Sequence, residues 1–228
     1  IATLPNNEDI KTSLKDSFII YLPKNVVSGD FYWFVVHENV SYIAVADCTG
    51  HGVPGSMVSL VCSNALNQSV KEFGLTEPAE ILNKTRNLVI DTFAKNGKEV
   101  KDGMDISLCS IKDNLITFSG ANNPLWIVRN LTDLSLEEKT LKSTVIKEKE
   151  GKALLEIKAD KQPVGLHLKM KPFTQKEIRI NKEDVLYLFT DGFADQFGGD
   201  KGKKLMYKPF KKMLIDIHLE RMEDQEKV

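Results

Sequence analysis

The sequence has no long apolar run, few cysteines and almost no net charge, and each of these absences excludes something. No stretch is long and apolar enough to span a bilayer, and no signal-peptide pattern is present, so we expect no direct membrane contact from this domain. The 31 lysines and arginines nearly balance the 32 aspartates and glutamates, which leaves a formal net charge of -1. That balance argues against nucleic acid or an anionic membrane as the main partner.

Cysteine is scarce and scattered. Cys48, Cys62 and Cys109 lie among apolar residues and have no zinc-binding spacing. We therefore expect reduced thiols in a cytoplasmic protein.

What is present is enough apolar sequence for one domain with a sizeable core, since 42% of the 228 residues are hydrophobic. Strands come first, a helix pair follows, and strands return before a last helix, so the order favours an α+β sandwich of mainly antiparallel sheet with helices outside. Residues 132–152 are charged and weakly patterned, which is typical of an exposed loop or ragged hairpin. A buried central strand is expected at 184–191. The other expected elements are strands at 17–22, 31–36, 41–46, 104–111, 115–121, 125–130, 153–160 and 175–180, and helices at 54–73, at 77–96 and from 203 to the end.

The stretch from residue 28 to 52 carries an aspartate at each end of a predicted hairpin. With Glu38 and Asn39 as a two-residue turn, Asp30 pairs with Asp47 across the open end of the hairpin. Like charges at directly paired positions are destabilising, unless a cation lies beside them. Carboxylate oxygens suit Mg²⁺ or Mn²⁺, so the pair predicts a metal site, with simple turn capping as the alternative.

Further acidic residues share this position at a strand end. Asp191 follows the apolar run LYLFT as Asp47 follows YIAVA, and a buried strand that ends in a carboxylate needs a partner for that group. Asp102 and Asp105 flank the start of another predicted strand. His51, in the glycine-rich turn before the first helix, is a candidate general acid or phosphate contact, and equally a simple turn residue.

Six motifs in order carry a resemblance to a known family. They are SGDFYWF, VADCTGHGVPGSM, DGMDISLC, FSGANNPLWIVR, QPVG and YLFTDGFADQFGG. The chain resembles the SpoIIE/RsbU-type branch of the PP2C-like, metal-dependent protein serine/threonine phosphatases. The resemblance implies a four-layer sandwich of two packed, mainly antiparallel β-sheets flanked by helix pairs. It also implies that residues 17–228 form the phosphatase domain and that residues 1–16 lead in from an upstream region.

The resemblance implies a centre of two Mn²⁺ or Mg²⁺ ions and hydrolysis by a metal-activated water. It makes His51 a candidate proton donor, although the wider family places its histidine where this chain has Thr49. Lys24 is a candidate phosphate contact. By motif the expected metal ligands are Asp47 as a bridge, the backbone carbonyl of Cys48, Asp191, Asp30 directly or through water, and Asp102 or Asp105 at a looser third metal.

The resemblance also implies partners. We expect a phosphorylated regulatory protein as substrate, with STAS-type anti-anti-sigma factors as candidates, and an upstream sensor or coiled-coil region on the same polypeptide. A homodimer is a further option.

One departure from the family pattern leaves a second function open. The family's last strand carries a further aspartate, and the sequence ends in HLERMEDQEKV without that strand. The alternative is therefore a catalytically impaired phosphatase fold that acts as a regulatory or binding module. A two-metal phosphodiesterase or nuclease is a third possibility, which the near-neutral charge disfavours.

Overall fold

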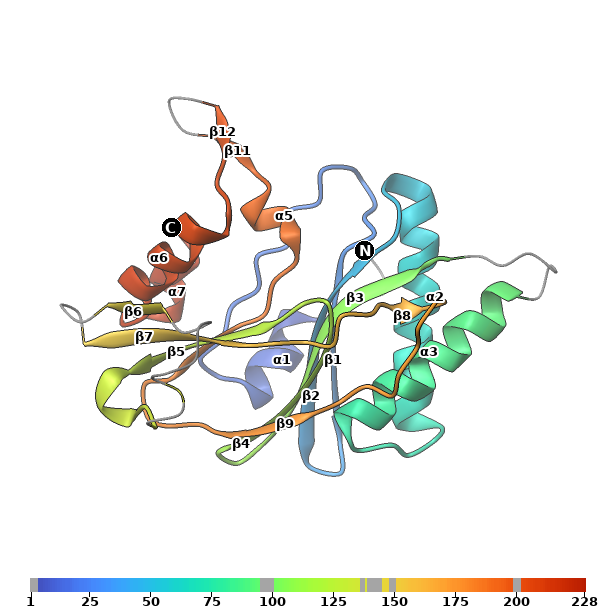
Figure 1. Ribbon diagram of the computed structural model, residues 1–228, viewed down its shortest axis with the longest axis horizontal. Helices are drawn as coiled ribbons and strands as arrows, with labels where there is room; N and C mark the ends of the chain where they lie inside the picture. Colours follow the sequence, from blue (N-terminus) through green and yellow to red (C-terminus); the bar gives the residue numbers. More distant parts are fainter. Residues whose placement is uncertain (1–3, 95–100, 136–137, 139–144, 148–150, 199–201) are drawn as a thin grey trace.

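The chain folds into two antiparallel sheets packed face to face, with helices on both outer sides (Figure 1). The computed structural model describes residues 4–94, 101–135, 138, 145–147, 151–198 and 202–228. The larger sheet has the strand order β1-β2-β3-β4-β9, with β8 paired to β3, and the smaller sheet has the order β10-β5-β7-β6. The larger sheet contains β1 (Phe31–His37), β2 (Val40–Cys48), β3 (Gly103–Lys112), β4 (Leu115–Ala121), β8 (Val164–Gly165) and β9 (Lys176–Arg179). The smaller sheet contains β5 (Leu125–Asn130), β6 (Val145–Lys147), β7 (Lys152–Ile157) and β10 (Val185–Tyr187).

The helices and a short hairpin complete the elements. On one outer side α2 (Gly52–Lys71) and α3 (Pro78–Ala94) pack together, and on the other side lie α6 (Tyr207–Ile217) and α7 (Met222–Gln225) (Figure 1). The remaining elements are α1 (Asn7–Ser13), the 3-10 turn η1 (Leu131–Asp133), α5 (Asp191–Ala194), and the hairpin strands β11 (Phe197–Gly198) and β12 (Lys203–Lys204). The expected sandwich of antiparallel sheets between helices is confirmed.

Strand alternation explains how the layers hold together. On β3, Ile106 and Leu108 join the core beneath α2 and α3, whereas Cys109 faces the smaller sheet. On β5, Ile127 faces the larger sheet and Trp126 faces α6. Both sheets thus bury both faces, so three apolar cores fill the spaces between four layers.

The hairpin of β1 and β2 has the register expected from the sequence. Glu38 and Asn39 have φ angles of 51° and 61°, as a two-residue type I′ turn requires, and His37 pairs with Val40. The ladder then runs to the pair formed by Phe31 and Ala46. Asp30 and Asp47 are the next pair in the same register.

Three expected elements were wrong in extent or kind. Residues 17–22 form no strand: this segment pairs with neither sheet among the described residues and crosses the end of β1 instead, where the Tyr21 hydroxyl donates to the Asp30 carbonyl over 3.1 Å. The helix expected from 203 onward begins only at Tyr207, because the chain first forms the hairpin of β11 and β12, and it is broken before α7.

The expected central strand at 184–191 is β10, a three-residue strand at the edge of the smaller sheet. The apolar run at 184–191 therefore does not come from a central position in the sheet. Leu186 and Leu188 pack toward the larger sheet, while Tyr187 and Phe189 pack toward α6. An edge strand between two layers is buried on both faces, so a continuous apolar run does not by itself indicate a central strand.

The segment before residue 17 contains α1, which packs beside β1. Ile10 is only 1% exposed, and the Tyr32 hydroxyl donates to the Pro5 carbonyl over 3.1 Å. The division of the chain at residue 17 stays a prediction.

Candidate functional site

Four aspartates gather at one end of the larger sheet. Asp47, at the end of β2, lies directly opposite Asp105 on β3, and Asp30 precedes β1 at the position that pairs with Asp47. Alternation places these three on the face turned toward the smaller sheet, because their neighbours Phe31, Ala46 and Ile106 pack beneath α2 and α3. Asp191 arrives from the smaller sheet at the start of α5.

A hydrogen bond joins the two sheets at this point. The Thr190 hydroxyl donates to Oδ2 of Asp30 over 2.7 Å, although 160 residues separate them. A Cβ added to Gly192 would lie 3.7 Å from the same oxygen. The loop that carries Asp191 therefore rests against Asp30, as the sequence-based site requires.

Burial and neighbouring carboxylates raise the pKa of Asp47, Asp105 and Asp191. Burial raises the pKa of Asp47 to about 7, together with the charges of Asp30 and Asp191, a hydrogen bond with Asp30 and the charge of Asp105. Burial also raises the pKa of Asp105, with a contribution from the charge of Asp191. The pKa of Asp191 is raised by burial first, and then by the charges of Asp195 and Asp30. The raised pKa values show that negative charge at these aspartates exceeds the positive charge that the described neighbours supply.

Polar neighbours hold these carboxylates in place. The amide of Asn122 donates to Oδ1 of Asp105 over 2.8 Å and opposes the rise in the pKa of that carboxyl. The Ser28 hydroxyl accepts a hydrogen bond from the backbone N–H of Asp30 over 3.0 Å, which fixes the main chain that carries this carboxylate. Neither Asn122 nor Thr190 was predicted from the sequence. The FSGANNP motif contains Asn122, but nothing in one sequence shows that its side chain turns back toward β3.

Asp102 takes a different place from Asp105. It accepts a hydrogen bond from the Thr49 hydroxyl over 2.9 Å, and the Thr49 N–H donates to the Gly103 carbonyl over 3.0 Å. Asp102 thereby ties the turn after β2 to the start of β3, whereas Asp105 is paired with Asp47 itself.

His51 and Lys24 line the same pocket as Asp30. The pocket has a volume of about 440 Å³ and lies between the segment 24–30 and the turn 50–52. His51 is the N-cap residue of α2 and is exposed, and its side chain makes no capping hydrogen bond. Both residues are candidates from the sequence, and the pocket places them beside one of the aspartates.

Close backbone contacts explain the glycines around this pocket. A Cβ at Gly55 would lie 2.5 Å from the Gly50 carbonyl oxygen, and a Cβ at Gly29 would lie 2.9 Å from the same atom. The Gly29 position is also 3.1 Å from the Cys48 carbonyl oxygen, which therefore faces the segment leading to Asp30. Only glycine permits α2 to begin so close to the hairpin end.

The donor set matches a hard divalent cation in its chemistry. Carboxylate oxygens with a backbone carbonyl are typical ligands of Mg²⁺ and Mn²⁺, and the raised pKa of Asp47 reflects an excess of negative charge that a cation would offset. Across the described residues, no three His, Cys, Asp or Glu side chains already converge as a finished metal site. The residues therefore fit a metal in type and charge, and their side chains are not yet arranged around one.

None of the helices in the described ranges could cross a membrane.

Comparisons with known proteins agree with this architecture. No curated protein sequence matches the chain. Among solved structures, the SiaA-PP2C domain of Pseudomonas aeruginosa is similar with a TM-score of 0.78 and 25% identity, over 99% of this chain and 81% of that one. The RsbU and RsbW domains of a Mycobacterium tuberculosis protein are similar with a TM-score of 0.61 and 16% identity, over 91% of this chain and 50% of that one.

A third similar structure is the PP2C phosphatase domain, with a fragment of the regulatory domain, of the cell fate determinant SpoIIE from Bacillus subtilis. Its TM-score is 0.55 at 15% identity, over 84% of this chain and 47% of that one. The family described as Stage II sporulation protein E (SpoIIE) matches residues 38–225, which is most of the chain and includes three of the four aspartates. The chain therefore belongs to the SpoIIE family of PP2C-type serine/threonine phosphatase domains.

Proposed function

We propose that this domain is a metal-dependent phosphatase that hydrolyses phosphoserine or phosphothreonine on a regulatory protein. The observation that carries the proposal is the gathering of Asp30, Asp47, Asp105 and Asp191 at the open end of the larger sheet, where burial and neighbouring carboxylates raise the pKa of Asp47, Asp105 and Asp191. Membership of the SpoIIE family supports it. A divalent ion bound there would lower the pKa of water enough to supply hydroxide as the nucleophile at neutral pH.

Each residue has a role in this proposal. Asp47, central to the group, would bridge two ions, with Asp191 and the backbone carbonyl of Cys48 as further ligands. Asp30 is hydrogen-bonded to Thr190 and would hold an ion directly or through a water. Asp105 or Asp102 would serve a third ion.

The pocket beside Asp30 would receive the phosphoryl group. Lys24 and His51 line it from two sides, so the ammonium could neutralise phosphate charge and the imidazole could protonate the leaving serine oxygen. Solved structures with the same fold include RsbX in complex with magnesium and PstP in complex with 2 manganese ions, which supports a choice between these two metals.

Protein partners are part of the proposal. The RsbU and RsbW domains occur together in one similar structure, which supports a phosphorylated partner-switching protein of STAS type as the substrate. An upstream sensor on the same polypeptide, a cytoplasmic location and a homodimer complete the proposal, with residues 17–228 as the phosphatase domain.

A metal titration combined with a phosphatase assay tests the function. We expect the chain, also extended beyond Val228, to hydrolyse p-nitrophenyl phosphate with Mn²⁺ or Mg²⁺ and to lose this activity on chelation. Asp47→Asn should lower kcat on the order of 10³-fold, because the bridging charge is lost. The control Asp113→Asn changes an exposed aspartate at the opposite end of β3 and should leave kcat unchanged.

Two results would contradict the proposal. An inert extended protein that still folds would support the alternative, a binding module that has kept the phosphatase fold. Equal metal affinity in the wild type and in Asp47→Asn would show that these aspartates do not form the metal site.

A further inference from the structure

A short hairpin projects from the body of the protein next to the aspartate group. It consists of β11 and β12 and follows α5, the helix that begins with Asp191 (Figure 1). Backbone hydrogen bonds tie its base to that segment: Leu205 N–H donates to the Gln196 carbonyl over 3.0 Å, and Met206 N–H donates to the Ala194 carbonyl over 2.8 Å. The hairpin is thus attached to α5, the helix that begins with the proposed metal ligand Asp191.

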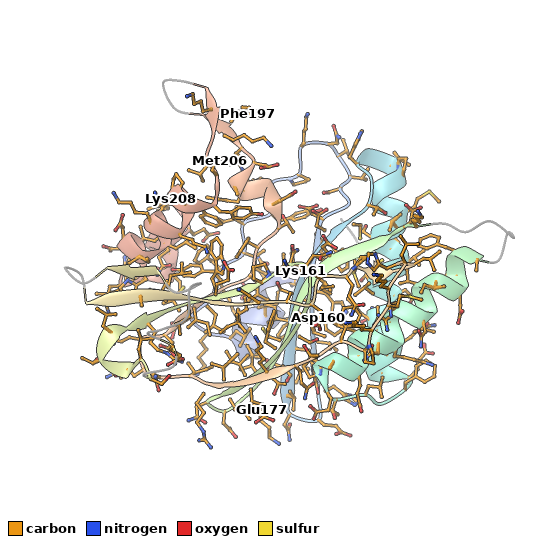
Figure 2. The ribbon with its side chains drawn as sticks, in the orientation of Figure 1. Asp160, Lys161, Glu177, Phe197, Met206 and Lys208 are labelled. Atoms are coloured by element: carbon orange, nitrogen blue, oxygen red, sulfur yellow. The ribbon has the colours of Figure 1, made fainter. Side chains whose placement is uncertain are left out.

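The hairpin and the start of α6 expose large apolar side chains. Phe197 is 72% exposed, Met206 56% and Tyr207 45%. Figure 2 shows Phe197 at the projecting hairpin, with Met206 and Lys208 following along the chain toward α6. Scattered exposed apolar residues are ordinary, but three within eleven residues beside a candidate active site indicate a contact surface.

Positive charge gathers on the same segment. Residues 196–212 contain six lysines and one aspartate, in a chain whose formal net charge is -1. Two of these lysines have partners: Lys204 Nζ lies 2.7 Å from Asp195 Oδ2, and Lys211 Nζ lies 2.6 Å from Glu156 Oε2. Within the described part of the chain, no carboxylate forms a salt bridge with Lys203 or Lys208, and both are exposed.

These charges act close to the aspartate group. Lys204 lowers the pKa of Asp191, against the larger effects of burial and of Asp195. The pKa of Tyr207 is raised by burial and then by the charges of Asp191, Asp195 and Asp47. Because the base of the hairpin is hydrogen-bonded to Ala194 and Gln196, at and just after the end of α5, a protein bound with its phosphoserine at the aspartates has the hairpin and the start of α6 beside it.

We propose that Phe197, Lys203, Met206 and Lys208, here called the hairpin surface, bind the substrate protein and select acidic residues flanking the phosphoserine. The two lysines would pair with carboxylates of the substrate, while Phe197 and Met206 would cover an apolar side chain. The charge of the surface is opposite to that of the aspartate group, so it attracts the negative flanks that the group itself repels. This inference rests on the proposed phosphatase function and names its substrate class.

Three substrates separate this inference from the function itself. One is a phosphoserine peptide with Asp and Glu flanks, the second has the same core with Ser and Asn flanks, and the third is p-nitrophenyl phosphate. We expect wild-type protein with Mn²⁺ to prefer the acidic peptide. The double variant Lys203→Ala/Lys208→Ala should lose about tenfold in kcat/KM on that peptide, most of it in KM. Activity on the other two substrates should stay within about twofold.

Two further variants complete the design. Phe197→Ala should raise KM for both peptides and leave p-nitrophenyl phosphate unaffected, because the small ester does not reach the hairpin. Lys112→Ala removes an exposed lysine at the end of β3 farthest from Asp105, and should change nothing. Raising the salt concentration should reduce the preference for the acidic peptide in the wild type and not in the double variant.

The outcomes are distinguishable. Hydrolysis of all three substrates without preference for acidic flanks would overturn the inference and leave the phosphatase function standing. If no substrate is hydrolysed, the function fails, and the inference then depends on fluorescence anisotropy with the acidic peptide: equal binding by the wild type and the double variant overturns it. Lysine-dependent binding to phosphatidylserine vesicles, with unchanged peptide kinetics, would overturn it in favour of a membrane contact.

Discussion

Two groups of charged residues in this protein are built in opposite ways. Between the layers, Arg129 is 4% exposed, and its guanidinium donates to both oxygens of Asp184, to Glu138 and to the Arg179 carbonyl over 2.7–3.1 Å. At the open end of the larger sheet, Asp47, Asp105 and Asp191 have raised pKa values because they are buried near other carboxylates, and the charge of Lys204 opposes this rise at Asp191. The first group finds its partners within the chain, whereas the second is predominantly negative among the described residues, as the proposed cation site requires.

The first group is a structural ion pair, and we propose that the second is a functional site. A buried charge is tolerated when the chain supplies its partner and its hydrogen bonds, as it does for Arg129. Uncompensated like charges cost stability, and this cost is the physical reason to propose a cation site at the strand end where the aspartates gather. Three changes test the contrast, in order of expected size.

The largest effect is expected from breaking the first group. Asp184→Ala leaves Arg129 buried without its bidentate partner and removes the acceptor for the Asn181 N–H, so we expect a loss of about 3–5 kcal/mol in the free energy of unfolding. Urea denaturation measures it. Lys182→Ala, an exposed change in the same turn, should stay within about 0.5 kcal/mol. A loss below about 1 kcal/mol in Asp184→Ala would show that the pair is not a structural anchor.

The aspartate group should respond in the opposite direction. The pKa of Asp47 is raised from 3.8 to about 7, so the metal-free folded state binds more protons than the unfolded state between these values, and its stability falls as pH rises through this window. Asp47→Asn removes that cost. We expect metal-free Asp47→Asn to be more stable than the wild type at pH 8 by on the order of 1–2 kcal/mol, after allowing for solvent screening.

Thermal or urea unfolding at several pH values checks this prediction. The advantage of Asp47→Asn should shrink as the pH falls from 7 toward 4, and Mn²⁺ should reverse the order by stabilising only the wild type. Asp113→Asn serves as the control with an exposed carboxylate. A metal-free variant that is less stable than the wild type at pH 8 would mean that the like charges are already compensated within the chain.

The smallest effect concerns the support of one carboxylate. Asn122 has a φ of 56°, so Asn122→Gly removes its hydrogen bond to Asp105 without straining the backbone. We expect affinity for Mn²⁺ to fall about tenfold, as measured by calorimetry, because an orienting partner is lost. Asn39→Gly changes a residue of similar φ, 61°, at the far turn, and should have no effect. Equal affinities in both variants would show that Asp105 needs no support from Asn122.

Local sequence signals predicted the part of the site that lies on one hairpin. The turn residues Glu38 and Asn39 set the register, and the register alone brings Asp30 and Asp47 to the same end. The order of the motifs indicated the family, and the match to residues 38–225 confirms it. The ligand assignments themselves stay predictions.

Predictions that depend on contacts between distant parts of the chain were wrong. The apolar run at 184–191 suggested a central strand, because burial on both faces has the same pattern whether a neighbouring strand or a neighbouring layer causes it. Residues 17–22 have the composition of a strand but lack a partner within the described fold.

By itself, then, the sequence determined the hairpin, its register and the type of donor atom at its open end, since these follow from turn chemistry and alternation over a few residues. Only the tertiary structure decided that Asp191 meets Asp30 through Thr190, that Asn122 turns toward Asp105, and that a lysine-bearing hairpin stands beside them. Those contacts join residues far apart in the chain, and their energy comes from the packing of two sheets, which no local pattern records.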